Sequence, residues 1–198
     1  MRTFISALAL TIVLTLLTGV VYPLAMYGLA ELTFPKQARG SLIVEGDKVV
    51  GSNLIGQNFS QARYFHSRTS AAGDKGYDAA GSGGSNLGPT NKVLIDGVRM
   101  RLKNVIESNP GLSPRDVPID IVTTSGSGLD PEISEAAADI QIARVAHARG
   151  LREDLVRGLV RQNTRSRWAG IFGEPGVNVL QLNFALDHVT GAASPAPD

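Results

Sequence analysis

The feature that most constrains this chain is a stretch without charged side chains near its start, residues 4–30. A helix of this length crosses about 30 Å of hydrocarbon with length left over for tilt. Because lipid offers no hydrogen-bond partners, the backbone must satisfy itself, and a helix is the expected form. A cleaved secretory signal is the alternative, since Gly28, Leu29 and Ala30 offer a cleavage site behind Arg2. The apolar run is longer than such signals usually have, and we therefore expect a retained membrane anchor.

One face of this predicted helix carries hydroxyl-bearing side chains. Thr11, Thr15, Thr18 and Tyr22 follow one another at helical spacing, which places them on one side. Small and hydroxyl-bearing residues let membrane helices approach closely, whereas apolar side chains gain little over lipid. The alternative is that each threonine bonds back to a carbonyl of its own helix. We interpret these four residues as a face for docking to another helix, here called the docking face. Pro23 should loosen the turns near the membrane exit.

Composition excludes several classes of function. The chain has 19 basic and 18 acidic residues, so it offers no general field for nucleic acid, and it has no cysteine for disulfides or thiolate metal sites. The part behind the anchor is long enough for one domain with its own core. We expect an anchor at 1–31, a domain at 32–190 and a disordered tail at 191–198. The charges that flank the anchor are nearly balanced, so the positive-inside rule does not orient it.

The first part of the domain is predicted to be a hairpin followed by a long irregular segment. The hairpin covers 41–50 with Gly46 in its turn, and its second strand is open to extension through Leu54 and Ile55. Residues 56–88 are rich in Gly, Ser, Ala and Asn and lack apolar periodicity, and a loop this long is often functional. Four larger side chains are expected to pin it to the core: Tyr64, Phe65, Tyr77 and Leu87.

The second part of the domain is predicted to be mostly helical, which makes the fold a mixed α/β (α+β) one. Periodicity and stop signals predict a helix at 89–107, a strand at 118–122 and a helix at 153–162. Between them, Asp130 is expected to cap a helix over 131–149 that ends at Gly150. Segment 179–189 fits either an alternating strand or a helix capped by Asn178. We favour the helix, because Asn178 and Gln181 resemble a capping box.

No active site is visible in the sequence. The loop 123–131, TTSGSGLDP, could cradle a phosphate, but it lacks the dinucleotide and Walker patterns, and a tight turn explains it better. The three histidines have no metal-ligand spacing, and no serine lies in a nucleophile-elbow motif. We therefore expect no catalytic residue, no metal site and no bound cofactor. Two other classes stay open: an anchored hydrolase acting through Ser125 or Ser127, and a ligand sensor that uses the 56–88 segment.

Seven motifs, taken together and in order, resemble the C subunit of the Kdp potassium-transporting ATPase. They are TGVVYPL, FPKQARGSLI, VVGSNLIGQNF, YFHSR, SGGSNLGPTN, TTSGSGLDP and GEPGVNVLQLNFALD, and they reach from the anchor to about residue 188. The departures are small: Thr69 stands where other members carry Pro, and the C-terminal tail is private to this chain.

The resemblance implies a non-catalytic, single-pass subunit of a complex in the bacterial inner membrane, with its domain in the periplasm. Its partners would be a channel-like potassium-translocating subunit, a P-type ATP-hydrolysing subunit and a small peptide subunit. The family is described as needed for assembly and as a catalytic chaperone that raises the ATP affinity of the pump subunit. ATP would then act only through the complex, since a P-type ATPase binds it in the cytoplasm.

Overall fold

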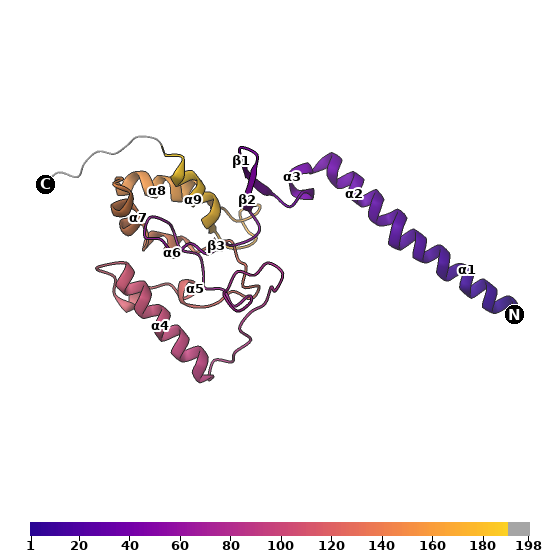
Figure 1. Ribbon diagram of the computed structural model, residues 1–198, viewed down its shortest axis with the longest axis horizontal. Helices are drawn as coiled ribbons and strands as arrows, with labels where there is room; N and C mark the ends of the chain where they lie inside the picture. Colours follow the sequence, from indigo (N-terminus) through magenta and orange to yellow (C-terminus); the bar gives the residue numbers. More distant parts are fainter. Residues whose placement is uncertain (190–198) are drawn as a thin grey trace. The chain divides into compact units, whose positions relative to one another are not determined.

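A computed structural model describes residues 1–189 of the chain. The chain divides into two units, Met1–Ser52 and the part from Asn53 onward. The first begins with one long helix, and the second combines helices with short strands (Figure 1). The predicted mixed fold behind a single N-terminal helix is therefore confirmed. The predicted tail, 191–198, lies outside the described residues, and the predicted domain bounds at 31 and 190 stay predictions.

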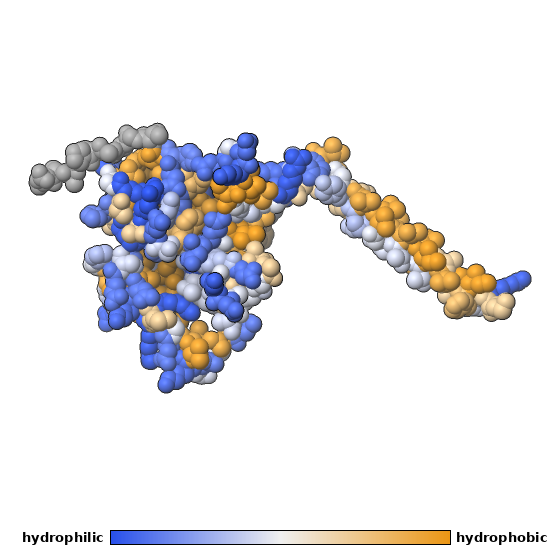
Figure 2. Space-filling view, viewed as in Figure 1, coloured by the Kyte–Doolittle hydropathy of each residue, from blue (hydrophilic) through white to orange (hydrophobic). Residues whose placement is uncertain are grey.

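The long helix of the first unit has three parts. These are α1 (Arg2–Leu16), the π-helical η1 (Leu17–Val21) and α2 (Tyr22–Thr33). Together they form one helix of 32 residues that is long and apolar enough to cross a membrane. Figure 2 shows a strongly hydrophobic side and a paler side along it. The helix expected at residues 4–30 is thus present.

The π-helical segment has a cause in the sequence. Pro23 has no N–H to give to the carbonyl one turn earlier, and its ring crowds that carbonyl. The Tyr22 N–H bonds to Leu17 O, a wider turn than the α-helical one, and such insertions relieve this crowding. The loosening predicted for the turns near the membrane exit thus lies elsewhere: it precedes the proline, at Leu17–Val21, while α2 behind it is regular.

A one-turn helix and a hairpin complete the first unit. The helix is α3 (Pro35–Ala38), and the strands are β1 (Leu42–Glu45) and β2 (Lys48–Ser52). The strands pair antiparallel, and Gly46 lies in the turn between them with φ of +59°. This pairing confirms the predicted hairpin, and glycine suits the turn because it adopts positive φ without a steric penalty.

The second strand of the hairpin does not continue through Leu54 and Ile55, so that extension was wrong. The chain leaves the ladder after Ser52 because Gly56 is held elsewhere. Its N–H donates to Leu129 O at 2.8 Å, and a Cβ on Gly56 would lie 2.4 Å from Asp130 O. This close approach of two backbones sets the path of the chain into the second unit.

The helix predicted at 89–107 is α4 (Lys92–Ser108), which begins where Asn91 caps it. The strand predicted at 118–122 was wrong. After the short 3₁₀ turn η2 (Pro114–Asp116), these residues form the one-turn helix α5 (Ile119–Val122). Asp120 there accepts hydrogen bonds from the backbone N–H and the hydroxyl of Ser134, at 2.8 and 3.0 Å. The periodicity of so short an apolar run does not separate a strand from a helical turn.

The helix predicted over 131–149 is also corrected, since three elements occupy this range. They are β3 (Glu132–Ile133), α6 (Glu135–Asp139) and α7 (Ile142–Arg149). The N-cap is Ser134, whose hydroxyl accepts from the Ala137 N–H. Gly150 ends α7 in the left-handed region, as predicted.

Asp130 does not cap a helix, contrary to the prediction. One of its carboxylate oxygens accepts from the Glu132 N–H at 3.0 Å, which turns the chain into β3. The other lies 2.9 Å from Arg68 Nη1 in an ion pair. The same short-range bond that favours Asp before a helix therefore serves a turn here.

The remaining elements are α8 (Glu153–Gln162), β4 (Thr164–Arg165), β5 (Gly176–Asn178) and α9 (Val179–Asp187). The strands form an antiparallel sheet in the order β3-β5-β4. The helix at 153–162 is confirmed, and segment 179–189 is a helix over most of its length. Its cap is Asn178, which accepts from the Gln181 N–H at 3.0 Å, as the capping-box pattern predicts.

The core of the second unit lies between its short helices and the sheet. Phe65, from the irregular segment, is fully buried in it, whereas Tyr64, Tyr77 and Leu87 are half-buried. The other buried apolar residues of this cluster are Ile121, Val122, Ile133, Ala137, Ala138, Ile142, Val145, Ala146, Val156, Val160, Val177, Val179, Leu182 and Leu186. The predicted role of Phe65 as an attachment point is confirmed.

Two buried side-chain amides, here called the amide clamps, hold the backbone beside Phe65. Asn183 Oδ1 accepts from the Phe65 N–H, and its Nδ2 donates to Phe65 O, both at 2.9 Å. Gln141 Oε1 accepts from the His66 N–H at 2.8 Å, and its Nε2 donates to His66 O at 3.2 Å. Each amide thus pairs with the segment as a neighbouring strand would.

We predict that Asn183→Leu destabilises the protein strongly, because it leaves the N–H and C=O of Phe65 buried without partners. Each such group costs about 1–3 kcal/mol, so the free energy of unfolding should fall by about 2–6 kcal/mol. Denaturant unfolding of the full chain in detergent, followed by circular dichroism, measures it. Lys103→Leu on the exposed side of α4 is the control, expected within about 0.5 kcal/mol of the parent. Equal losses in the two variants would contradict the clamp.

Candidate functional site

The predicted docking face lies on the long helix. Thr11 and Thr15 are in α1, Thr18 is in η1, and Tyr22 begins α2. Because a π-helical turn takes more residues than an α-helical one, Tyr22 stays close to the side of Thr18. The Thr18 hydroxyl donates to Leu14 O at 2.8 Å, so the alternative of bonding back to the helix is present at this residue. Docking at this face stays a prediction.

The Gly-rich loop 123–131 packs against a second Gly-rich segment of the chain. Ser127 O accepts from the Gly83 N–H at 2.8 Å and from the Ser82 hydroxyl at 3.0 Å. Gly128 has φ of +67°, and a Cβ there would lie 2.6 Å from Gly83 O. Because backbone fills the space in front of the loop, the structure favours the tight turn over a phosphate cradle.

Neither serine considered for a hydrolase stands ready as a nucleophile. Ser125 is buried, and the Ser127 hydroxyl accepts from the Leu129 N–H at 3.1 Å. A nucleophilic serine needs an accessible hydroxyl beside a general base. The hydrolase alternative therefore gains no support from these two residues. Among residues 1–189, no group of three His, Asp or Glu side chains is placed to hold a metal ion.

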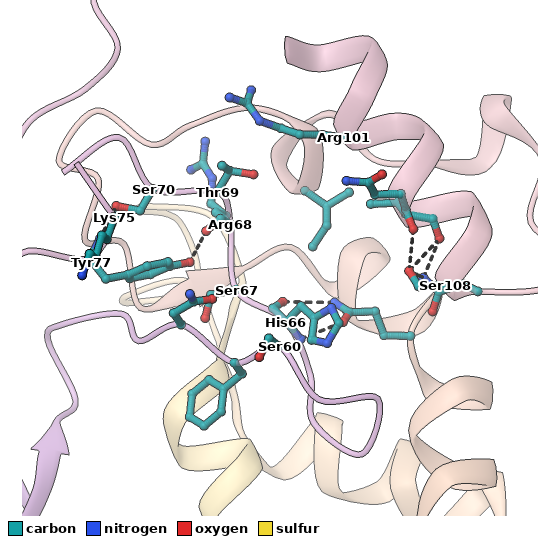
Figure 3. A pocket seen from close by; sticks show the side chains of 18 residues that line it. Ser60, His66, Ser67, Arg68, Thr69, Ser70, Lys75, Tyr77, Arg101 and Ser108 are labelled. Atoms are coloured by element: carbon teal, nitrogen blue, oxygen red, sulfur yellow. Dashed lines mark hydrogen bonds between the residues drawn. The ribbon is translucent and has the colours of Figure 1, made fainter. Parts of the chain in front are cut away.

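A cavity of about 410 Å³ lies between the irregular segment and α4 (Figure 3). Three cationic side chains line it: Arg68 and Lys75 from the irregular segment and Arg101 from α4. No carboxylate of the described part of the chain lines it. The rest of the wall is polar with a few apolar groups: Asn58, Phe59, Ser60, His66, Ser67, Thr69, Ser70, Gly76, Tyr77, Asn104, Val105, Ser108, Asn109, Ile121 and Gln141.

Arg68 is the most constrained of these cations. Its Nη1 pairs with Asp130, and its backbone carbonyl accepts from the Tyr77 hydroxyl, while its buried Nε finds no partner within residues 1–189. Arg101 donates to Val122 O at 3.2 Å and has no ion pair among the described residues. An unused buried N–H beside cations is suited to a small anion, since each anionic oxygen accepts a charge-assisted hydrogen bond.

The floor of the cavity holds a histidine that stays neutral at neutral pH. Burial lowers the pKa of His66, and the nearby guanidinium of Arg144 lowers it further. Burial also lowers the pKa of Arg144 to about 10. Arg144 remains charged, and its Nη1 donates to Ala62 O and Tyr64 O at 2.6 and 2.9 Å. These side chains thus hold the irregular segment in place and do not form an acid–base pair.

Sequence reasoning did not find this cavity. Its cations come from positions 68, 75 and 101, and Gln141 joins them from α7's N-terminal side, a set without a motif spacing. The one usable signal was the length of the irregular segment, which the sequence marked as often functional.

Comparison with known proteins gives one consistent family. The family model described as K⁺-transporting ATPase, c chain (KdpC) matches residues 4–188. The potassium-transporting ATPase KdpC subunit of Rhodospirillum rubrum is 56% identical over 187 residues, 94% of this chain and 96% of the relative. Its counterpart in Polaromonas naphthalenivorans is 53% identical over 189 residues, 96% of both chains. The KdpC subunit of Herpetosiphon aurantiacus is 50% identical over 190 residues, 96% and 98% of the two chains.

The lowered pKa of His66 predicts a loss of stability in mild acid. The unfolded chain takes up the proton near pH 6.5, while the folded protein resists it to a lower pH, so stability falls as pH drops below about 6.5. His66→Gln should flatten the change in melting temperature between pH 7 and pH 5. His147→Gln, an exposed site, should leave the slope as in the parent.

Asp187 titrates in a separate window. Burial alone would raise its pKa, but hydrogen bonds from Arg149, Tyr64 and Arg63 outweigh this and lower it. Its contribution is therefore lost only below about pH 4. A slope between pH 7 and pH 5 that persists unchanged in His66→Gln would show that another group carries it.

Proposed function

Because the chain belongs to the family of the K⁺-transporting ATPase c chain, KdpC, we propose that it is a non-catalytic accessory subunit that raises the ATP affinity of a P-type partner, as a catalytic chaperone. The observation that carries this proposal is the match over residues 4–188, which includes both the long apolar helix and the domain. ATP hydrolysis then resides in the P-type subunit and potassium passage in a channel-like subunit, with a small peptide subunit completing the complex.

The proposed place of the protein is the bacterial inner membrane, crossed once, with the domain in the periplasm. A periplasmic domain and a cytoplasmic ATP site lie on opposite sides of the bilayer. The subunit would then act on ATP affinity by favouring one conformation of the pump, since two ligands coupled to the same equilibrium change each other's affinity. The protein itself needs no bound cofactor for this, and ATP enters only through the complex.

A conformational effect of this kind requires contact with the pump, and the docking face offers one inside the membrane. A threonine hydroxyl that donates to its own helix still has lone pairs to accept a bond from a neighbour. The bond from Thr18 to Leu14 O is therefore compatible with docking. Contacts of this kind are weak one by one, about 0.6 kcal/mol on average, so the face has to act as a set.

Ligand sensing is a second candidate, and the cationic cavity is the observation that favours it. A sensor would bind its ligand without the pump. Calorimetric titration of the purified full chain with inorganic phosphate tests this, with Arg101→Gln as the variant that should weaken any binding. Heat of binding in the parent alone would support a sensor, and equal heats in both would place the ion outside the cavity.

We predict that replacing Thr11, Thr15 and Thr18 together by Leu weakens the complex. The helix still inserts, because Leu favours insertion by a few tenths of a kcal/mol per residue, but the added bulk and lost hydroxyls prevent close approach. Less of the variant should copurify with the ATP-hydrolysing subunit in mild detergent, and ATP affinity should fall in proportion.

The control carries three changes of similar size off that face: Ile12→Leu, Val13→Leu and Leu16→Ile. It should copurify as the parent does. If the two triple variants copurify alike, the docking face is ordinary lipid-facing helix and association depends on the domain.

A further inference from the structure

The turn between β4 and β5 exposes large apolar side chains at its end. Trp168, Ile171 and Phe172 are 72%, 72% and 60% exposed. We call residues 168–172 the aromatic tip. None of its residues lines the cavity or belongs to the docking face, and neither proposed role uses it. Grouped exposed apolar residues of this size usually mark a contact with a partner or a membrane.

The aromatic tip is ordered by its own hydrogen bonds. The Trp168 N–H donates to Phe172 O at 2.8 Å, and the Phe172 N–H donates back to Trp168 O at 2.9 Å. The two rings pack with centroids 5.6 Å apart. Gly170, with φ of +75°, allows the tight reversal between them. The tip thus holds its apolar side chains outward without a partner, and a contact there would cost little ordering.

The flanks of the tip are basic. Arg165 and Arg167 precede it, paired with Glu132 and Glu174 at 2.7 and 2.8 Å. Arg161, one helical turn before the strand, is exposed and has no ion pair among the described residues. Three arginines against the single Glu174 leave the segment 161–176 positively charged. Trp with flanking Arg is the composition found at membrane–water interfaces, where the indole meets the headgroups.

We propose that the aromatic tip inserts into the headgroup region of the bilayer that holds the anchor helix. The inference rests on the proposed membrane anchorage. Three side chains are far fewer than the 20–30 residues a side of a standard protein interface. Three side chains are enough for insertion into a bilayer that is tethered nearby. The residues that link the anchor to the domain, 34–52, reach at most about 65 Å when extended, so the bilayer stays within that distance. A surface held this close is present at high effective concentration, so weak insertion is enough.

Trp168 is the only tryptophan of the chain, so its fluorescence reports on the tip alone. The full chain is placed in vesicles of phosphatidylethanolamine and phosphatidylglycerol. We expect the Trp168 emission to lie at shorter wavelength in these vesicles than in a reference sample without a bilayer, in which amphipathic polymer keeps the protein soluble. Lipids brominated near the headgroup should quench it, and iodide in the water should quench it less. An unshifted emission that brominated lipids leave unquenched would overturn the proposal.

The test variant is Ile171→Ser with Phe172→Ser, which should lose the shift and the lipid quenching while its melting temperature stays that of the parent. Val93→Ser with Met100→Ser is the control, since these residues of α4 are 70% and 62% exposed and lie away from the tip. The control should keep both signals. Equal loss in both pairs would overturn the assignment to the tip.

Two further outcomes separate this inference from the anchor and from a protein partner. Release of the chain from the vesicles by alkaline carbonate would mean that residues 2–33 do not span the bilayer. The released fraction is measured without fluorescence, so this result is independent of Trp168. Shielding of Trp168 that appears only when pump subunits share the vesicle, without lipid quenching, would assign the tip to a protein surface and overturn insertion.

Discussion

The amide clamps are the interaction on which the rest of the domain depends. The segment before α4 has almost no regular structure, yet Phe65 in its middle is fully buried. A buried backbone without a neighbouring strand would leave polar groups unpaired at a cost of about 1–3 kcal/mol each. Asn183 and Gln141 remove that cost by presenting a donor and an acceptor side by side. Arg144 satisfies two further carbonyls of the same segment, since its Nη1 donates to Ala62 O and Tyr64 O.

The sequence predicted those elements that are determined by neighbouring residues, and it failed where residues distant in the chain determine the structure. The long apolar helix, the hairpin turn at Gly46, the end of α7 at Gly150 and the cap at Asn178 depend on neighbouring residues, and all were predicted. The strand at 118–122 and the helix over 131–149 were wrong because distant groups decide there: Asp120 bonds to Ser134, and Asp130 to Arg68. The cavity was missed for the same reason, since its walls meet only in the folded chain.

Electrostatics in this domain serves mainly to hold chain segments. Arg149 bonds to Arg63 O, Leu186 O and Asp187, which joins the irregular segment to α9. The cavity differs, because its cations outnumber their partners and, of residues 1–189, no carboxylate lines it. Arginines such as Arg149 hold chain segments together, whereas the cations of the cavity are suited to an anion. The proposed docking face relies on the opposite kind of contact: its hydroxyl bonds would be uncharged and individually weak, so that only their number would give them effect.

The clamp at Phe65 also sets the order in which the domain can be completed. Its two halves lie 118 positions apart, and Asn183 belongs to the last helix described. During synthesis Phe65 emerges well before its partner Asn183, because 118 positions separate the two residues. Contacts at such separation form late and slowly, because the chain pays for closing the loop before it gains them. Until Asn183 has been synthesised, the domain of the nascent protein stays unfinished around Phe65.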